Sequence, residues 1–366
     1  MSNSYGLGHD VARVTGTVPR ELVHKHAPHE VLLTDWTTHG RDRHTVRARW
    51  PRFHTFYASR NRRFDPLLFV ETVRQTFPLL SHTAYGVPFG SHLVWDDFSF
   101  EVEPPGMLVP PGPADVVLDV TCRDVRMRKG CLVSMTMHAR ALLDGRPVGS
   151  ASTRFTNHSP AVYRRLRGEH GLAAKHLRAV PLPPGLLPGT VGHLLPENVV
   201  LARTEHAGRW QLRVDLDHAV LFDHPVDHAP GMLLLEALRQ AAHATYPATD
   251  TMVTAMSVSF EKWVELDEAA WVSVRPLRRN VLRAVIEQSG APCLSGEVTV
   301  QAVPVPAAGS PRPLPPDGLG PLGPLGPLGQ LGPLGPSDEV PRSPGEAGRE
   351  AVGAVAPAPA TGGRAG

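Results

Sequence analysis

Three polar residues interrupt an otherwise apolar segment at a spacing that could carry acid–base or anion-binding chemistry. Glu236, Arg239 and Gln240 lie within the apolar run 232–242. Positions i, i+3 and i+4 share one face of a helix, so these side chains form a single stripe. A helix that is apolar on its other faces is buried, and a buried carboxylate and guanidinium need partners or a function. The stripe is therefore either a structural ion pair or part of a site.

The same stripe occurs earlier in the chain as Glu71, Arg74 and Gln75. The flanking sequences agree as well, because Val, Pro and a following apolar run align at one offset between residues 23–34 and 191–202. These matches indicate an internal repeat. An unusual feature that occurs twice, each time in a buried helix, favours a site built from both copies.

The two expected helices begin differently. Asp65 suits the N-cap and Pro66 the first helical position of the first helix, which Pro78 is expected to end. The second helix follows Pro230 and Gly231. Free N–H groups at a helix start can polarise a thioester carbonyl, and a glycine lets the acyl group come close. We therefore expect the Gly231 N–H to be a catalytic donor.

Strand-like sequence follows each helix. A single apolar helix with that much antiparallel sheet should be wrapped by the sheet, which predicts an α+β double hot-dog fold. The expected strands are 93–102, 116–126, 131–142 and 147–156, then 252–261, 271–276, 281–288 and 295–303. The expected organisation is a flexible arm (1–18), repeat 1 (19–158), a linker (159–190), repeat 2 (191–305) and a disordered Pro/Gly/Leu-rich tail (306–366).

The loop before the second helix concentrates Asp223, His224, Asp227 and His228. Their spacing matches no closed zinc pattern and no cysteine is near, so we expect no metal. We expect His224 or Asp227 to fix the loop or contact substrate, and the alternative is an ordinary helix start with surface histidines. Burial is expected to raise the pKa of Glu236 toward neutrality, which would suit it to act as an acid or base.

Eight arginines gather ahead of the first helix, opposed only by Asp42. They are either a solvated sheet face or a site for an anion, such as a substrate phosphate or an acidic acyl carrier protein. Arg60, Arg62 and Arg63 are expected to lie nearest to a pocket. The eight are Arg41, Arg43, Arg47, Arg49, Arg52, Arg60, Arg62 and Arg63.

Composition excludes several classes of protein. The net charge of +2 and the lack of a helix-turn-helix pattern argue against a nucleic-acid binder, and no apolar window is long enough for a membrane helix. The N-terminus has no signal-peptide pattern. Three cysteines without CxxC spacing suggest a reducing, cytoplasmic setting. The sequence is compatible with an oligomer.

The stretches 23–36, 64–75 and 224–241 together resemble the AfsA-like family of A-factor biosynthesis hot-dog proteins, the γ-butyrolactone synthases. The resemblance covers residues 20–305. It implies an acyltransferase that moves a β-ketoacyl group from an acyl carrier protein or coenzyme A thioester to the hydroxyl of dihydroxyacetone phosphate, without a cofactor. The ester would then cyclise by an aldol condensation toward a γ-butyrolactone signal. Family functional positions fall on Glu71, Glu236 and Arg239.

This reading implies a division of roles. The Gly231 N–H holds the thioester carbonyl, Glu236 or Glu71 removes the hydroxyl proton, and Arg239 holds the phosphate or orients Glu236. The alternatives are a hot-dog dehydratase or thioesterase, or a non-catalytic regulatory paralogue. The residues expected to contact substrate are His224, Asp227, Arg74, Gln75, Gln240, Arg62 and Arg63.

Overall fold

The computed structural model describes residues 16–170, 179–246 and 250–303. The expected tail at 306–366 and most of the expected arm lie outside these residues. The helices are α1 (Pro66–Thr83), α2 (Pro160–Arg167) and α4 (Gly231–Thr245), with 3-10 turns η1 (Arg20–Val23), η2 (Pro28–Glu30), η3 (Pro188–Val191) and η4 (Pro196–Asn198). The strands are β1 (Leu33–Thr38), β2 (Arg43–Trp50), β3 (His92–Val102), β4 (Ala114–Arg128), β5 (Cys131–Leu143), β6 (Arg146–His158), β7 (Leu201–Arg203), β8 (Arg209–Leu212), β9 (Thr251–Phe260), β10 (Trp271–Arg278), β11 (Val281–Gln288) and β12 (Ala291–Ala302).

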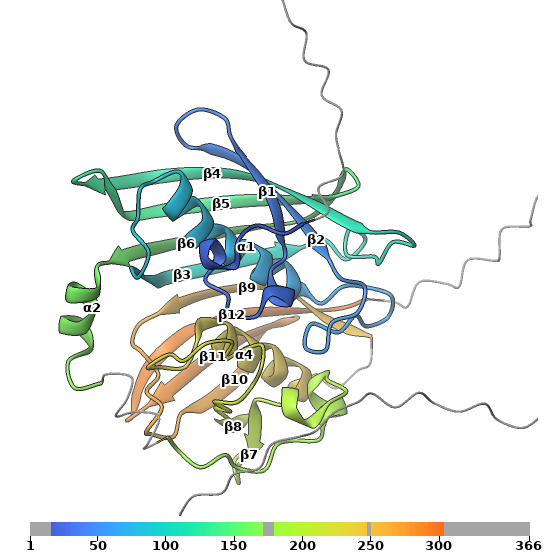
Figure 1. The fold of residues 1–366 in the computed structure, drawn as a ribbon. Coiled ribbons are helices and arrows are strands. Elements are labelled where there is room, and N and C mark those ends of the chain that lie inside the picture. Colours follow the sequence, from blue (N-terminus) through green and yellow to red (C-terminus); the bar gives the residue numbers. More distant parts are fainter. Residues whose placement is uncertain (1–15, 171–178, 247–249, 304–366) are drawn as a thin grey trace, which may run out of the picture. The chain divides into compact units, whose positions relative to one another are not determined.

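The strands of both repeats form one continuous antiparallel sheet (Figure 1). Its order is β1-β2-β4-β5-β6-β3-β9-β12-β11-β10-β8-β7. The two halves join at β3 and β9, where Phe98 pairs with Val258 and Phe100 with Met256. Each half repeats the same topology, so the predicted double hot-dog fold is confirmed.

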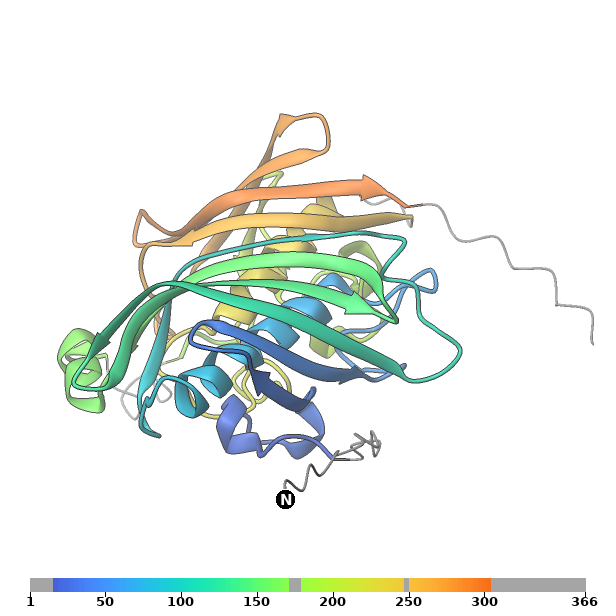
Figure 2. The same cartoon turned by 90° about the horizontal axis from the view of Figure 1, so that it is seen from above.

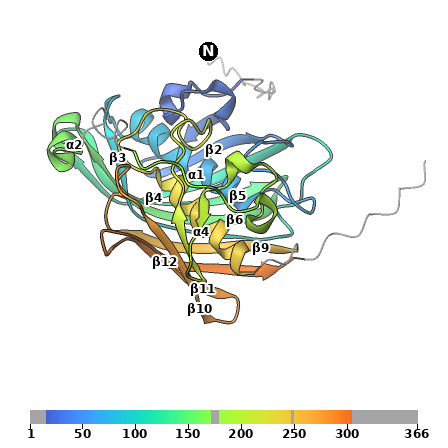
Figure 3. The ribbon, with the colours of Figure 1, turned by 90° about the horizontal axis from the view of Figure 1, so that it is seen from below.

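The helices α1 and α4 lie on the same side of this sheet, which curves over them (Figures 2 and 3). Both are buried on nearly every side, as their apolar sequences predict. In the described part of the chain, no helix has the length and apolar character needed to cross a membrane.

The prediction that Pro78 ends the first helix is wrong, because α1 continues to Thr83. Proline in a helix interior lacks one N–H and costs about 3 kcal/mol. Burial of Leu79 and Leu80, both 0% exposed, offsets that cost. Proline fits the helical φ angle, so the chain continues where its apolar pattern continues.

Two expected boundaries also look different in the structure. Val18, within the expected arm, is buried, and its N–H donates to the Leu33 carbonyl over 2.9 Å. The expected linker 159–190 contains α2, whose N-cap is Ser159, and most of η3. Residues 171–178 of that segment lie outside the described residues.

Two glycines let neighbouring strands approach closely, one in each of the equivalent strand pairs β6–β3 and β12–β9. A Cβ on Gly149 of β6 would lie 2.3 Å from the Glu101 carbonyl oxygen of β3. A Cβ on Gly296 of β12 would lie 2.1 Å from the Ser257 carbonyl oxygen of β9. Both neighbours are backbone atoms that cannot rotate away, so each strand pair depends on its glycine.

We therefore expect Gly149→Ala and Gly296→Ala each to lower the free energy of unfolding by about 2 kcal/mol, measured by denaturant titration. Gly112→Ala is the matched control, because a Cβ there meets nothing within 4 Å. The control should change stability by less than about 0.5 kcal/mol. Equal stability of all three variants would contradict the packing argument.

Candidate active site

The first stripe forms a buried ion cluster on α1. The carboxylate of Glu71 accepts hydrogen bonds from Arg74 Nε and Nη2 over 2.8 and 2.9 Å. Lys25 Nζ lies 3.1 Å from Glu71 Oε1. Lys25 and Glu71 are nearly inaccessible to solvent, whereas Arg74 keeps part of its side chain exposed. The carboxylate thus has two cationic partners.

The second stripe forms an equivalent cluster on α4. Glu236 accepts from Arg239 Nε and Nη2 over 2.8 and 2.7 Å. His193 takes the place of Lys25, with its Nε2 2.7 Å from Glu236 Oε1. Arg239 also lies 3.6 Å from Asp65 of the first repeat. The stripes are therefore self-paired, as the structural reading anticipated.

Both carboxylates are ionised. Burial raises the pKa of Glu71, but the charges of Arg74 and Lys25 outweigh burial and lower it to about 2. Burial likewise opposes ionisation of Glu236, and Arg239 and His193 lower its pKa well below the usual range. The expectation that the Glu236 pKa rises toward neutrality is wrong, because the sequence did not reveal how completely the carboxylate is paired.

Gln75 and Gln240 clamp the helices to the turns before β1 and β7. Gln75 donates to the Glu30 carbonyl over 2.7 Å and accepts from the Leu32 N–H over 2.9 Å. Gln240 makes the same two bonds, to the Asn198 carbonyl and from the Val200 N–H, over 2.7 and 2.9 Å. Both glutamines are 0% exposed. The amide groups of both side chains are therefore occupied by backbone groups.

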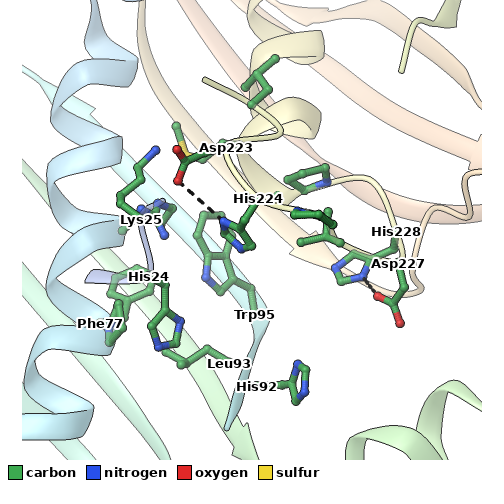
Figure 4. Close-up of a pocket in the computed structure, with 18 of the residues that line it drawn as sticks. His24, Lys25, Phe77, His92, Leu93, Trp95, Asp223, His224, Asp227 and His228 are labelled. Carbon is green, nitrogen blue, oxygen red and sulfur yellow. Dashed lines mark hydrogen bonds and ion pairs between the residues drawn. The ribbon is translucent and has the colours of Figure 1, made fainter. Parts of the chain in front are cut away.

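A cavity of about 640 Å³ lies between the first-repeat helix and the second-repeat loop. Figure 4 shows Lys25 and Phe77 on one side, with His224, Asp227 and His228 on the other. Its walls combine apolar side chains with charges of both signs. The lining residues include His24, Lys25, Tyr57, Glu71, Arg74, Phe77, Pro78, His92, Leu93, Trp95, Tyr163, Arg164, Arg167, Val220, Leu221, Asp223, His224, Val226, Asp227, His228, Pro230, Gly231 and Met232.

The cavity brings together Glu71, Arg74, Gly231, His224 and Asp227 of the expected site residues. The other six lie elsewhere. The lining residues do not include Glu236, Gln75 or Gln240, and Arg239 and Arg63 border a separate pocket of about 30 Å³. Arg62 is exposed outside it, and most of the other clustered arginines face solvent. Only the first of the two ion clusters therefore reaches the large cavity.

The start of α4 is open to this cavity. Its N-cap, Pro230, supplies no side-chain hydrogen bond, whereas Asp65 caps α1 by accepting from the Leu67 N–H over 2.8 Å. Gly231 packs on Trp95, since a Cβ on it would lie 3.0 Å from the indole ring. The first amides of α4 are thus placed beside an apolar wall, an arrangement that suits a thioester carbonyl.

The two acidic residues of the loop before α4, Asp223 and Asp227, bind different partners. Asp223 accepts hydrogen bonds from the backbone N–H groups of His26 and Ala27, so it ties the loop to the first repeat. Asp227 instead accepts from the hydroxyl of Tyr163 over 2.7 Å and from Arg167 Nε over 2.9 Å. Asp223 is an anchor between repeats, and Asp227 is the centre of a side-chain network.

Sequence reasoning missed three residues of this site. Tyr163 and Arg167 come from α2, within the expected linker, where Ser159 and Pro160 form a helix-start signal that could have been read. Lys25 aligns with His193 when the two repeats are superimposed in sequence. Its pairing with Glu71 could have been inferred only from the fold.

Comparison with known proteins agrees with this architecture. Residues 9–159 and 178–304 match the family described as AfsA, A-factor biosynthesis hotdog domain. A Streptomyces virginiae protein called 2-oxo-3-(phosphooxy)propyl 3-oxoalkanoate synthase is 44% identical over 264 residues, which cover 72% of this chain and 89% of that protein. A Streptomyces coelicolor protein of the same name is 34% identical over 281 residues, covering 75% and 88%.

Two solved structures are similar at low identity. A putative oleoyl thioesterase from Lactobacillus plantarum has a TM-score of 0.44 and 12% identity, covering 72% of this chain and 96% of that one. A dehydratase domain of the rifamycin polyketide synthase has a TM-score of 0.39 and 14% identity, covering 74% and 95%. The family match and the identity to the two synthases establish that the chain belongs to the A-factor biosynthesis hotdog domain family.

Proposed function

We propose that this protein transfers a 3-oxoacyl group from a thioester to the hydroxyl of dihydroxyacetone phosphate. The observation that carries the proposal is the 44% identity to a 2-oxo-3-(phosphooxy)propyl 3-oxoalkanoate synthase, over 89% of that protein. The large cavity supports it, because it offers an apolar wall, an open helix start and a buried cationic cluster in one space. An acyl thioester and a phosphorylated acceptor need these three features together.

The acyl thioester is assigned to the α4 side of the cavity. The carbonyl oxygen would accept from the Gly231 N–H, where negative charge develops as the acceptor attacks. Phe77, Leu93 and Trp95 offer apolar surface for the acyl chain. Loss of one such donor typically costs about 3 kcal/mol of transition-state stabilisation, so the geometry at Gly231 is central to the proposal.

The phosphorylated acceptor is assigned to the α1 side. Lys25 and Arg74 carry two positive charges against the single charge of Glu71, so the cluster has a net charge of +1. A phosphate dianion would be attracted to it. Glu71 stays ionised, and four donor groups contact its two oxygens. We therefore assign Glu71 to holding Lys25 and Arg74 in place rather than to accepting the hydroxyl proton.

We further propose that the acyl donor is a carrier-protein or coenzyme A thioester and that the protein works in the cytoplasm. Three free cysteines, Cys122, Cys131 and Cys293, support a reducing compartment. The resemblance that suggested the reaction also suggests these donors.

Purified protein incubated with a 3-oxoacyl thioester and dihydroxyacetone phosphate should yield the phosphorylated ester and its cyclised product, detected by mass spectrometry. Omitting the acceptor should stop release of the thiol. Dihydroxyacetone without phosphate should react far more slowly, because it lacks the charge that Lys25 and Arg74 attract. Release of free 3-oxo acid without any acceptor would instead indicate a thioesterase.

Glu71→Gln and Glu236→Gln form a matched pair, because the two carboxylates have equivalent partners but only Glu71 lines the cavity. Each variant leaves buried cations unpaired and should lower the free energy of unfolding by about 3 kcal/mol at neutral pH. Per folded molecule, Glu71→Gln should lose much more turnover. Equal losses of turnover per folded molecule would contradict the assignment of the acceptor site to the Glu71 side.

The stability difference between Glu71→Gln and the wild type should depend on pH. The folded-state pKa of Glu71 is about 2, below its ordinary value of 4.5, so its stabilisation is fully present above pH 4.5. That stabilisation is lost as the pH falls toward 2, because the proton then neutralises the carboxylate. Denaturant titrations at several pH values should show the difference in unfolding free energy between wild type and Glu71→Gln shrinking as the pH falls from 4.5 toward 2. A difference that stays constant would contradict the assigned charge state of Glu71.

A further inference from the structure

An Asp–His pair lies in the loop before α4, with Asp227 buried and His228 partly buried. His228 Nδ1 is 2.7 Å from Asp227 Oδ1. An ionised carboxylate can only accept, so Nδ1 carries the proton and donates it to Asp227. In a neutral imidazole, this leaves Nε2 without a proton and able to accept one.

The carboxylate of this pair is fixed from three sides. Burial raises the pKa of Asp227, but the hydrogen bonds from His228, Tyr163 and Arg167 outweigh it and lower that pKa well below its usual range. Arg167 is itself held by Glu265 through two hydrogen bonds of 2.8 Å, and its guanidinium lies 4.7 Å from the Trp263 ring centroid. The imidazole is therefore oriented by a chain of charged groups that runs from repeat 2 through α2.

The other cavity histidines lack this arrangement. His224 Nδ1 is 3.7 Å from Asp223, a carboxylate already engaged by two backbone N–H groups. His24 pairs with another histidine, His82, over 2.8 Å, and burial together with nearby positive groups lowers its pKa to about 3. Of the described histidines that line the cavity, only His228 has a carboxylate oxygen within hydrogen-bond distance of its ring.

His228 also stands where two cavities meet. A second cavity of about 310 Å³ adjoins the larger one, and four residues line both. A reaction between two substrates needs a residue that both can reach, and Gly231, the proposed carbonyl donor, is another of the four. The shared residues are Leu93, Trp95, His228 and Gly231.

We propose that His228 is a catalytic residue of the acyl transfer, and this inference rests on the proposed function. Its Nε2 accepts the proton of the acceptor hydroxyl while the hydroxyl oxygen bonds to the thioester carbonyl carbon. Collapse of the tetrahedral intermediate re-forms the carbonyl, breaks the C–S bond and returns the proton from His228 to the leaving sulfur. The products are the ester and the free thiol, and the histidine ends in its starting form.

Asp227, Tyr163 and Arg167 are then positioning residues. Asp227 fixes the tautomer and orientation of the ring, while Tyr163 and Arg167 fix Asp227. Tyr163 also stacks on His92, with ring centroids 3.7 Å apart, so α2 is bound to β3 at the cavity (Figures 1 and 3).

The test is the turnover of His228→Ala in full-length protein with a 3-oxoacyl thioester and dihydroxyacetone phosphate. We expect kcat to fall by about a hundredfold to ten-thousandfold, with little change in the KM for the thioester. Added imidazole should restore part of the activity, because a small base can enter the space that the side chain left. His228→Gln, which keeps a donor for Asp227 but no comparable base, provides a second inactive variant if His228→Ala does not fold.

His224→Ala is the matched control from the same loop, and imidazole should not restore whatever activity it loses. Wild-type turnover in folded His228→Ala, or a loss that imidazole does not repair, would overturn the inference. If the wild-type protein makes no ester from these substrates, the proposed function fails instead. Nitrogen NMR of His228 gives a separate reading: Nδ1 should carry the proton in the wild type, and a proton on Nε2 alone would contradict the geometry.

Discussion

The structure depends on keeping two carboxylates ionised inside helices that a sheet encloses. Isolated burial of either charge would be prohibitive, so Glu71 and Glu236 each need an arginine one turn along the helix and a further basic group from a turn before the sheet. The next turns along the chain, η2 and η4, are held to the same helices by Gln75 and Gln240. The ion clusters therefore set where each helix sits relative to its 3-10 turns, and the position of the loop and cavity follows from that.

Both repeats contain this ion cluster, but the residues around it differ. Where the first repeat has His24, the second has Gly192, and a Cβ there would lie 2.7 Å from Arg60 Nη1. The half-buried Arg60 thus occupies the space beside the second cluster, where only about 30 Å³ remains. The first cluster has no such filling and opens onto about 640 Å³. The same geometry, repeated in the chain, therefore gives one closed cluster and one open candidate site.

Much of this could be predicted because the helices are specified locally. The apolar runs, the i, i+3, i+4 stripe and the strand patterns predict both helices and the double hot-dog fold. The pKa of Glu236 is lowered by Arg239 of the same stripe and by His193, which is distant in sequence, so the local pattern did not show how completely this carboxylate is paired. Which stripe faces the cavity depends on Arg60 and Gly192, and the role of α2 depends on its docking against Asp227. Each of these is a tertiary contact without a local pattern.

A single chain with two repeats can build a site that a symmetric pair cannot. In a two-fold symmetric dimer every residue appears twice, so an open cavity on one side implies an equal cavity on the other. Here the large cavity takes α1 from the first repeat, the His224–His228 loop from the second, and α2 from the segment between them. The segment that contains α2 has no second copy among residues 16–170, 179–246 and 250–303. Because Arg167 and Tyr163 come from α2, the described part of the chain forms the network around Asp227 on one side only, and the proposed chemistry lies on that side.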